Sequence, residues 1–441
     1  MRRLRTIIAL SLVWFLIFLG VFLRSYKADV YPVDNNDDGL FYAWAGLSLY
    51  DNPLKPMSHS IFDKDNPALI WRSQFMDFQP LDRFGLKLTQ PWLDHPPLAT
   101  LVIALPAKLL GYKTFELIPQ IIVRYPAIIA SIFTLWLTYL LALKLFNRSV
   151  ALWSLAFLAT VPYFVVAHRQ SFLENFLTPV FLGSWLAYLN KKYKLAMVLS
   201  FLTGWIKVPG FSVPFMFALK SRRFALVGVA SILTYLGYGW LVGKEFFWQT
   251  ITNQGVRGAF VNSFYDEISK PHFYGGFADG WYILGFALIF FMLTKFKSEK
   301  FKVYNWFMAA WLLVLFLVAG RFNNSPWYYY PLIPFLAINL GYFTAQTLKV
   351  NNLFMVLPFW LLGLTGFDLI AINIPPLWLR LTTIVFFAPF VLNFKKLAFW
   401  WTRLLIVGLI LLNIYVNLRF TTVHCLKERC LAPTKIMVNN D

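Results

Sequence analysis

Charged residues are scarce in this chain of 441 residues, and their scarcity indicates the class of protein. They make up 14% of the sequence, against roughly a quarter in a soluble domain. Hydrophobic residues make up 59%, and the mean hydropathy is +0.60. Apolar runs of about 17 to 22 residues recur, long enough for membrane helices, and the short alternating segments of a β-barrel are missing. The sequence therefore predicts an all-α polytopic membrane protein.

Cysteine is nearly absent, and so are several motifs. Cys425 and Cys430 are the two cysteines of the chain and lie close together in a polar tail. They could form a disulfide if the tail is extracytoplasmic, whereas two thiolates alone make only half a zinc site. The chain has no Gly-rich phosphate loop, so ATP chemistry of that kind is not supported.

Acidic residues are half as numerous as basic ones, 20 against 40, and the formal net charge is +20. In a membrane protein this excess fits cytoplasmic loops that fix the topology, better than nucleic-acid binding. The start "MRRLRTIIALSLVWFLIFLGVFL" resembles a signal peptide without a cleavage site, so we expect an uncleaved first span with a cytoplasmic N-terminus. The acids gather in residues 29–94 and 266–279, which we therefore place outside.

If the apolar segment 97–111 crossed the membrane, every basic cluster after it would lie outside. We therefore expect this segment to lie at the outer interface. Between Lys194 and Lys220, two short segments should meet near Lys207, where "KVPG" breaks the helix. The total is about 13 spans. The others are expected near 121–143, 150–167, 172–190, 224–242, 280–295, 303–320, 327–346, 352–373, 378–394 and 398–417.

Charged residues at the outer membrane edge indicate a functional site, because placing a charge there costs free energy. In "NNDDGLFYAWAG", Asp37 and Asp38 open a helix, which could also be simple N-capping. In "WLDHPPLATL", Asp94 and His95 precede a helix start; Asp94 could merely cap, and the pair could bind a phosphate or a metal.

Three further stretches fall on the same predicted side. In "AHRQSFLEN", Arg169 and Glu174 could form a local ion pair. In "GWIKVPGF", Lys207 lies at the helix break and would face an anion or a cavity. In "GRFNNSPWYYYPLIPFLA", Arg321 precedes three tyrosines that an aromatic belt would also explain. Carboxylates surrounded by cations suit one task, in which an acid deprotonates a hydroxyl while the cations hold a phosphate.

The order of these motifs resembles the GT-C glycosyltransferases of the protein O-mannosyltransferase and lipid A aminoarabinose transferase superfamily. The likeness covers roughly residues 1–350 and includes "VRYPA" with Arg124, "DHPPL", "K-x-P-G" and "YYYPLIP". No MIR-type soluble domain is appended, as in a prokaryotic member. The chain departs from the family at Asp38-Gly39, where Asp-Glu is common.

The resemblance implies a GT-C fold with juxtamembrane helices in the first outer loop, and sugar transfer from a polyprenyl-phosphate donor to a glycan acceptor. Asp38 would be the general base, with Asp37 and Asp94 as further catalytic carboxylates. It implies donor-phosphate binding by His95, Lys207 and Arg321, and the set of cations around the carboxylates adds Arg169. We expect substrate binding by Tyr42, Glu174 and Tyr329, and by Arg257 and His272 of the outer loop 243–279. A divalent metal ion at Asp38, Asp94 and His95 is a further option.

The chemistry agrees with this pattern, because a phosphate ester leaves without a protein acid and needs only positive groups around it. A single displacement would invert the anomeric centre. The predicted units are a catalytic module (1–350) with outer loops 25–120 and 243–279, C-terminal helices (351–417) and an extracytoplasmic tail (418–441). The loop 243–279 could be a mobile lid or an ordinary linker.

Two other classes remain open from the sequence. A transporter or lipid flippase also has broken helices and buried charges, although the chain shows no half-to-half symmetry and its charges crowd one face. A structural subunit of an envelope complex would need no carboxylate cavity at the outer face.

Overall fold

The computed structural model describes residues 2–32, 38–60, 69–71, 86–219, 221–255, 279–295, 298–318 and 326–428. These residues are mostly helical. In chain order the elements are α1 (Arg2–Ser25), α2 (Asp38–Asp51), β1 (Ser58–His59), β2 (Leu69–Trp71), β3 (Leu86–Thr89), α3 (Leu98–Leu109), α4 (Gln120–Leu145), α5 (Arg148–Thr160), α6 (Pro162–Ala167), α7 (Glu174–Leu189), α8 (Tyr193–Ile206), the 3₁₀ helix η1 (Val208–Phe211), α9 (Ser212–Ala218), α10 (Arg222–Gly243), α11 (Glu245–Gly255), α13 (Gly280–Leu293), α14 (Glu299–Val318), η2 (Pro326–Leu332), α15 (Ile333–Val350), α16 (Leu353–Gly363), α17 (Gly366–Leu369), α18 (Pro376–Val391) and α19 (Lys395–Glu428).

Helices occupy the apolar runs that the sequence predicted as spans, although several are short. Within the described ranges, four helices are long and apolar enough to cross a bilayer: α4, α10, α14 and α19 up to Phe420. Other apolar helices are shorter, because proline interrupts some of the runs, as Pro162 does after α5 and Pro209 does after α8. The all-α membrane architecture is confirmed in this coarse form, and the total of about 13 spans stays a prediction.

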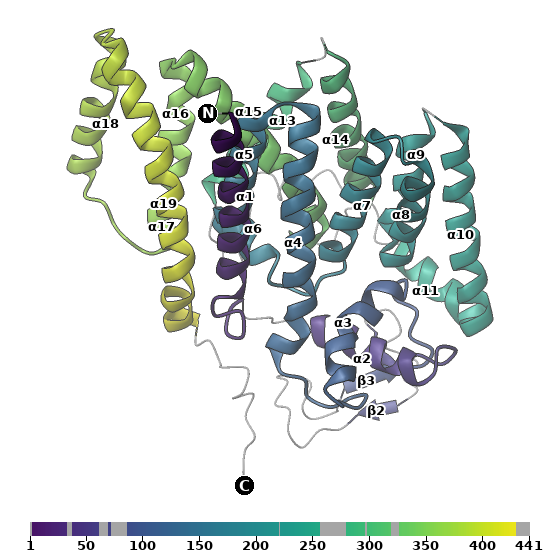
Figure 1. The fold of residues 1–441 in the computed structure, drawn as a ribbon. Coiled ribbons are helices and arrows are strands. Elements are labelled where there is room, and N and C mark those ends of the chain that lie inside the picture. Colours follow the sequence, from purple (N-terminus) through teal and green to yellow (C-terminus); the bar gives the residue numbers. More distant parts are fainter. Residues whose placement is uncertain are drawn as a thin grey trace.

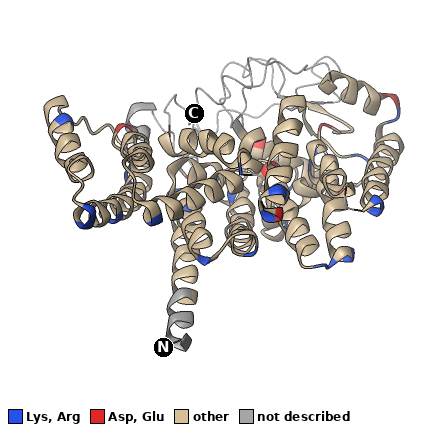
Figure 2. Ribbon diagram, turned by 90° about the horizontal axis from the view of Figure 1, so that it is seen from above, with Lys and Arg blue, Asp and Glu red and all other residues tan. Residues whose placement is uncertain are grey.

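The two ends of the helix assembly differ in character. Figure 1 shows the long helices running side by side, with α2, α3 and a small sheet gathered beyond their lower ends. The N-terminus and the connections from α4 to α5 and from α18 to α19 lie at the upper end, where Lys144, Arg148 and Lys395 are found. Figure 2 looks down on this end and shows Lys and Arg at several helix ends. The first loop therefore lies at the end opposite to the N-terminus.

The first loop folds as α2, α3 and a three-stranded antiparallel sheet in the order β1-β3-β2. The two helices are the ones expected there, and α3 is the helix expected over 97–111. The sheet was not predicted, because strands of two to four residues are too short to show alternation. Among the described residues, this sheet is the departure from an all-α chain.

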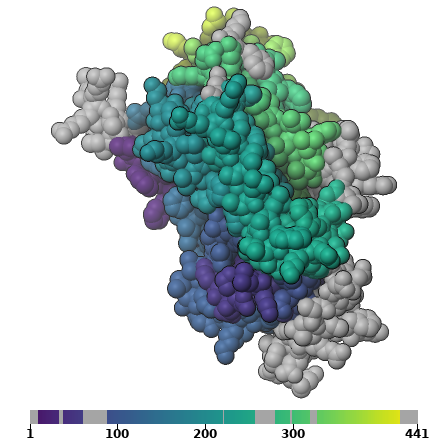
Figure 3. Space-filling model, turned by 90° about the vertical axis from the view of Figure 1, so that its right-hand side faces the viewer, coloured from purple at the N-terminus to yellow at the C-terminus, as the bar shows by residue number. Residues whose placement is uncertain are grey.

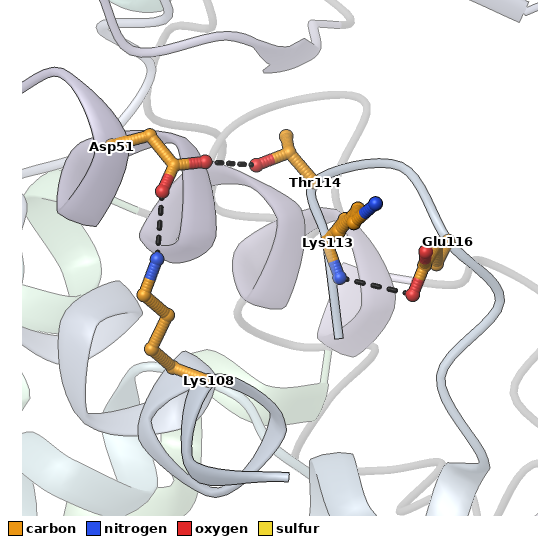
Figure 4. A network of polar contacts seen from close by, with 5 residues as sticks. All are labelled: Asp51, Lys108, Lys113, Thr114 and Glu116. Atoms are coloured by element: carbon orange, nitrogen blue, oxygen red, sulfur yellow. Dashed lines mark hydrogen bonds and ion pairs between the residues drawn. The ribbon is translucent and has the colours of Figure 1, made fainter. Parts of the chain in front are cut away.

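A close helix crossing and a polar network hold α2 against α3. A Cβ at Gly46 would lie 2.1 Å from the carbonyl oxygen of Thr100, so only glycine permits this approach. At the far end of α2, Lys108 donates to Asp51 Oδ1 at 2.7 Å, and Thr114 donates to Oδ2 at 3.0 Å (Figure 4). The ion pair lowers the pKa of Asp51, mainly through the Lys108 hydrogen bond. These contacts set the direction of α2, whose other end carries Asp38.

The core between the helices is aromatic and closely packed. The rings of Trp185 and Phe307 stack with centroids 4.5 Å apart, joining α7 to α14. Helix α15 lies so close to α5 that a Cβ at Gly341 would come within 2.3 Å of Ser154 Oγ. Without water in the bilayer, such packing between helices supplies much of the stability.

The break between α5 and α6 ties distant helices together. The carbonyl of Leu158 would normally accept from residue 162, but Pro162 has no N–H. Arg24 of α1 supplies the missing donor at 2.8 Å. The carbonyl of Thr160 accepts from Asn417 of α19 at 2.7 Å. The freed backbone groups are thus satisfied inside the protein, as a membrane environment requires.

Candidate active site

Asp38 is the first residue of α2 and stands where three segments meet. A Cβ on the next residue, Gly39, would lie 3.1 Å from Val123 of α4 and 3.5 Å from Ser171, just before α7. Ser171 in turn hydrogen-bonds the carbonyl of Val123. The start of α2 is therefore seated against α4 and the segment leading into α7. A larger side chain at position 39, such as the second acid common in the family, would need these neighbours to move.

Tyr42, one turn along α2, shows which charged groups surround this position. Its pKa is raised well above the usual value, first by burial and then by the charge of Asp38. Glu174, Tyr328 and Asp94 raise it further. Asp38, Asp94 and Glu174 come from sequence positions far apart, yet all three act on one phenol. The predicted carboxylates thus gather around Tyr42.

Asp94 and His95 lie beside the same tyrosine. The Asp94 carboxylate is buried and accepts a hydrogen bond from Ser60 Oγ at 2.8 Å. The main-chain carbonyl of Asp94 accepts a hydrogen bond from the side-chain amide of Gln254 in α11. The half-buried ring of His95 lies 5.6 Å from that of Tyr42, edge to face. The first loop and α11 therefore fix this pair. In Figure 3, the teal surface of α10 and α11 borders the purple and blue surface of the first loop.

Lys207 occupies the break between α8 and η1, in extended conformation. The chain turns tightly there, because a Cβ at Gly210 would lie 2.0 Å from the carbonyl oxygen of Thr203. The ammonium forms a buried ion pair with Glu174 and lies 4.4 Å from the centroid of the Tyr328 ring. A buried ammonium needs such partners, since an isolated one is very costly. The predicted pair of Arg169 with Glu174 is replaced by Lys207 with Glu174.

A cavity of about 480 Å³ opens beside Lys207. Its polar side chains come from the first loop, the α8 break, α10, α11 and η2, and its apolar ones from η1, α10, α11 and α14. Leu317 of α14, at its rim, is 64% exposed, so the cavity reaches the apolar surface of the helix assembly. The lining residues are His95, Lys207, Val208, Pro209, Phe211, Ile232, Tyr235, Leu236, Ile251, Gln254, Gly255, Leu317, Val318 and Tyr328.

Two predicted site residues face other surroundings. The buried Arg169 donates to the carbonyls of Leu23 at 2.6 Å and Tyr31 at 3.5 Å, so its guanidinium faces the end of α1. Tyr329 is buried, while its neighbour Tyr328 lines the cavity. Three consecutive tyrosines show no periodicity that would distinguish one face of the segment from another. The sequence therefore could not show which tyrosine faces the site. The binding roles assigned to Arg169 and Tyr329 stay predictions.

Several predicted residues lie outside the described part of the chain: Asp37, Arg257, His272, Arg321 and Cys430. Most of the predicted lid, 243–279, is also outside, apart from the end of α10, α11 and Asp279. The side chain of Cys425 is likewise not described, so the disulfide stays a prediction.

Sequence reasoning missed Ser60 and Gln254. Ser60 is 34 residues and Gln254 160 residues from Asp94 in the chain, and neither belongs to a motif. Only the meeting of the first loop with α11 brings them together.

The metal set of Asp38, Asp94 and His95 receives no support from the geometry. Across the described ranges, no three His, Cys, Asp or Glu side chains are grouped as metal ligands would be. One Asp94 oxygen is already taken by Ser60. We therefore derive no step through a metal ion, and its presence stays a prediction.

The comparisons with known proteins agree with the predicted family. Residues 94–244 match the family model described as dolichyl-phosphate-mannose-protein mannosyltransferase. No curated protein matches the chain. The fold is similar to that of ArnT from Cupriavidus metallidurans bound to undecaprenyl phosphate, with a TM-score of 0.54 and 15% identity over 97% of this chain and 79% of that one. The apo state of ArnT gives 0.50 and 14% over 95% and 77%.

A weaker likeness is to the archaeal oligosaccharyltransferase AglB from Archaeoglobus fulgidus, with a TM-score of 0.48 and 12% identity over 90% of this chain and 56% of that one. The family match and the ArnT-like fold confirm the resemblance predicted from the ordered motifs.

Proposed function

We propose that this chain, a membrane protein with an ArnT-like GT-C fold and a mannosyltransferase-family match, transfers a sugar from a polyprenyl-phosphate donor to a glycan acceptor. The family match and the fold support a membrane glycosyltransferase. The donor, the inverting course and the Asp38 base are our proposals. By the positive-inside rule, the N-terminus is cytoplasmic and the site extracytoplasmic.

The observation that carries the proposal is the amphiphilic cavity beside the carboxylates. Its volume of about 480 Å³ falls in the usual range for small-molecule sites. Lys207 and His95 suit a phosphate, and the apolar side chains of α10 and α14 suit a prenyl chain leading to the lipid-facing surface. The ArnT crystal structure with undecaprenyl phosphate supports a ligand of this kind on this fold.

The proposed reaction is one displacement. An acceptor hydroxyl or amine attacks the anomeric carbon and gives its proton to the Asp38 carboxylate. The bond from the anomeric carbon to the phosphate oxygen breaks, and the polyprenyl phosphate leaves with the electron pair. Lys207 and His95 stabilise the charge that develops on it. Attack opposite to the leaving group inverts the anomeric centre, and no protein acid is required.

The test incubates the purified chain in lipid nanodiscs with a panel of polyprenyl-phosphate sugars and measures release of polyprenyl phosphate. Protein, lipid and polymer acceptors are supplied in separate arms. We expect Asp38→Asn to lower turnover by about 10²- to 10⁴-fold, the usual contribution of a general base. The matched control is Asp368→Asn, an exposed acid of α17 outside the site, which should leave turnover nearly unchanged.

Each outcome has a clear meaning. Normal turnover by Asp38→Asn would show that another group is the base. If no donor of the panel is cleaved, while the chain in proteoliposomes moves undecaprenyl phosphate across the bilayer, the chain is a lipid transporter and the proposal is wrong.

A further inference from the structure

We infer that Glu174 is an internal counter-anion of Lys207 that competes with the donor phosphate for the ammonium, and that it thereby promotes release of the polyprenyl-phosphate product. This inference rests on the proposed function, because it takes Lys207 as a ligand of the donor phosphate. It gives Glu174 a role that differs from direct substrate binding.

The pair is closed off from solvent. The side chains of Lys207 and Glu174 are 4% and 3% exposed, and the ammonium contacts a carboxylate oxygen directly. Its second contact is the face of the Tyr328 ring at 4.4 Å. Without Glu174, the described part of the chain would leave this ring as the partner of the buried ammonium, and a ring compensates a lost anion poorly.

The two members of the pair lie at different depths. Among the described residues, Lys207 and Tyr328 belong to the cavity lining, whereas Glu174 does not. A phosphate entering the cavity would therefore reach Lys207 without displacing Glu174 from the cavity wall. One cation would then be shared between two anions.

Glu174 is poorly satisfied apart from this pair. Within the described part of the chain, its Oε2 atom is buried and has no hydrogen-bond partner. Its main chain is fixed at the start of α7, where the carbonyl accepts from Thr178 at 2.7 Å. Next to it, the Asn175 amide donates to the carbonyls of Ala167 and Gln170. The carboxylate is thus anchored behind Lys207 and cannot follow the ammonium far.

These contacts determine whether Glu174 weakens or tightens phosphate binding. Glu174 stabilises the empty site, where it neutralises Lys207. In the loaded site it lies near a second anion and loses part of its partner. The two anions therefore weaken one another's binding to Lys207, which is a negative coupling. Close buried charge pairs couple strongly, so removing the charge of Glu174 should tighten phosphate binding by about tenfold or more.

The experiment measures equilibrium binding of undecaprenyl phosphate to the full chain in nanodiscs at neutral pH. Glu174→Gln keeps the shape and removes the charge, and we expect its Kd to fall about tenfold. The uncharged undecaprenol should bind the variant and the parent protein alike. Glu299→Gln is the matched control, because Glu299 pairs with Lys302 at 2.7 Å on an exposed surface; its Kd should not change.

A purely structural role for Glu174 predicts the opposite sign, since a damaged site binds its ligand more weakly. An unchanged or raised Kd in Glu174→Gln would therefore overturn the inference. If the parent protein binds undecaprenol but not undecaprenyl phosphate, the proposed donor site itself fails.

If Glu174→Gln does not fold, Glu174→Asp takes its place. This variant keeps the charge but withdraws it from Lys207, and a Kd between those of the parent protein and a full charge removal is expected. A Kd equal to or above that of the parent protein would refute the counter-anion role.

Discussion

Replacing Arg124 with methionine tests whether main-chain anchoring positions Asp38. Arg124 is 2% exposed, and its guanidinium donates to the carbonyls of Ala28 and Pro32, at 2.6 Å each. This segment leads from α1 toward Asp38. Hydrogen bonds from a charged donor contribute about 1.5–3 kcal/mol each, so losing both removes about 3–6 kcal/mol. The variant no longer buries a charge, which offsets part of the loss, and we expect a net destabilisation of about 3 kcal/mol.

The effect on catalysis should exceed the effect on binding. Lys207 and His95 are not touched by the change, so donor KM should stay close to that of the parent protein. A misplacement of about 1 Å at the reacting centre can cost about 10²-fold in rate, and we expect kcat to fall by this order. Arg124→Lys, which can hold only one carbonyl, should lie between the two.

The assays are thermal unfolding in nanodiscs and steady-state turnover, with the exposed Arg222→Met as the control. Unchanged unfolding temperature and kcat in Arg124→Met would refute the argument that this arginine positions the acid.

Two further predictions concern the walls of the site. Gly39→Glu introduces the second acid that is common in the family this chain resembles, and it places a Cβ 3.1 Å from Val123. We expect a lower unfolding temperature and no gain in turnover, and a faster enzyme would show that the missing acid had limited the rate. Gln254→Leu removes the hydrogen bond that fixes the carbonyl of residue 94, worth about 1 kcal/mol, and should lower kcat/KM about fivefold. Gln249→Leu, on the exposed face of the same helix, should have no effect, and equal losses in both variants would point to general damage of α11.

Much of the architecture could be read from the sequence because membrane helices follow composition closely. Apolar runs, basic loops and the proline at the α8 break each act locally, and the structure has helices and breaks near the expected residues. The small sheet of the first loop escaped prediction, since its pairing depends on residues that are far apart in the chain. Tyr328 escaped selection for a similar reason, because the 3₁₀ geometry of η2 decides which tyrosine faces the cavity.

The buried cations show that residue type alone does not predict which partner a buried cation will have. Lys207 and Arg169 were both predicted as phosphate ligands, because cations in apolar surroundings need anions. In the structure only Lys207 lines the cavity. Arg169 and Arg124 are bonded to main-chain carbonyls instead. A guanidinium can be satisfied by carbonyl oxygens, and no pattern in the sequence shows which acceptor it will find.

The sequence by itself determined that this is a helical membrane protein and which residue types stand at the ends of its helices. These properties depend on transfer of each segment from water to lipid, which is nearly additive along the chain. The tertiary structure alone decided that Glu174 pairs with Lys207, that Gln254 reaches Asp94, and that an apolar cavity opens beside them. Such contacts join segments up to 160 residues apart, and their geometry depends on how whole helices pack.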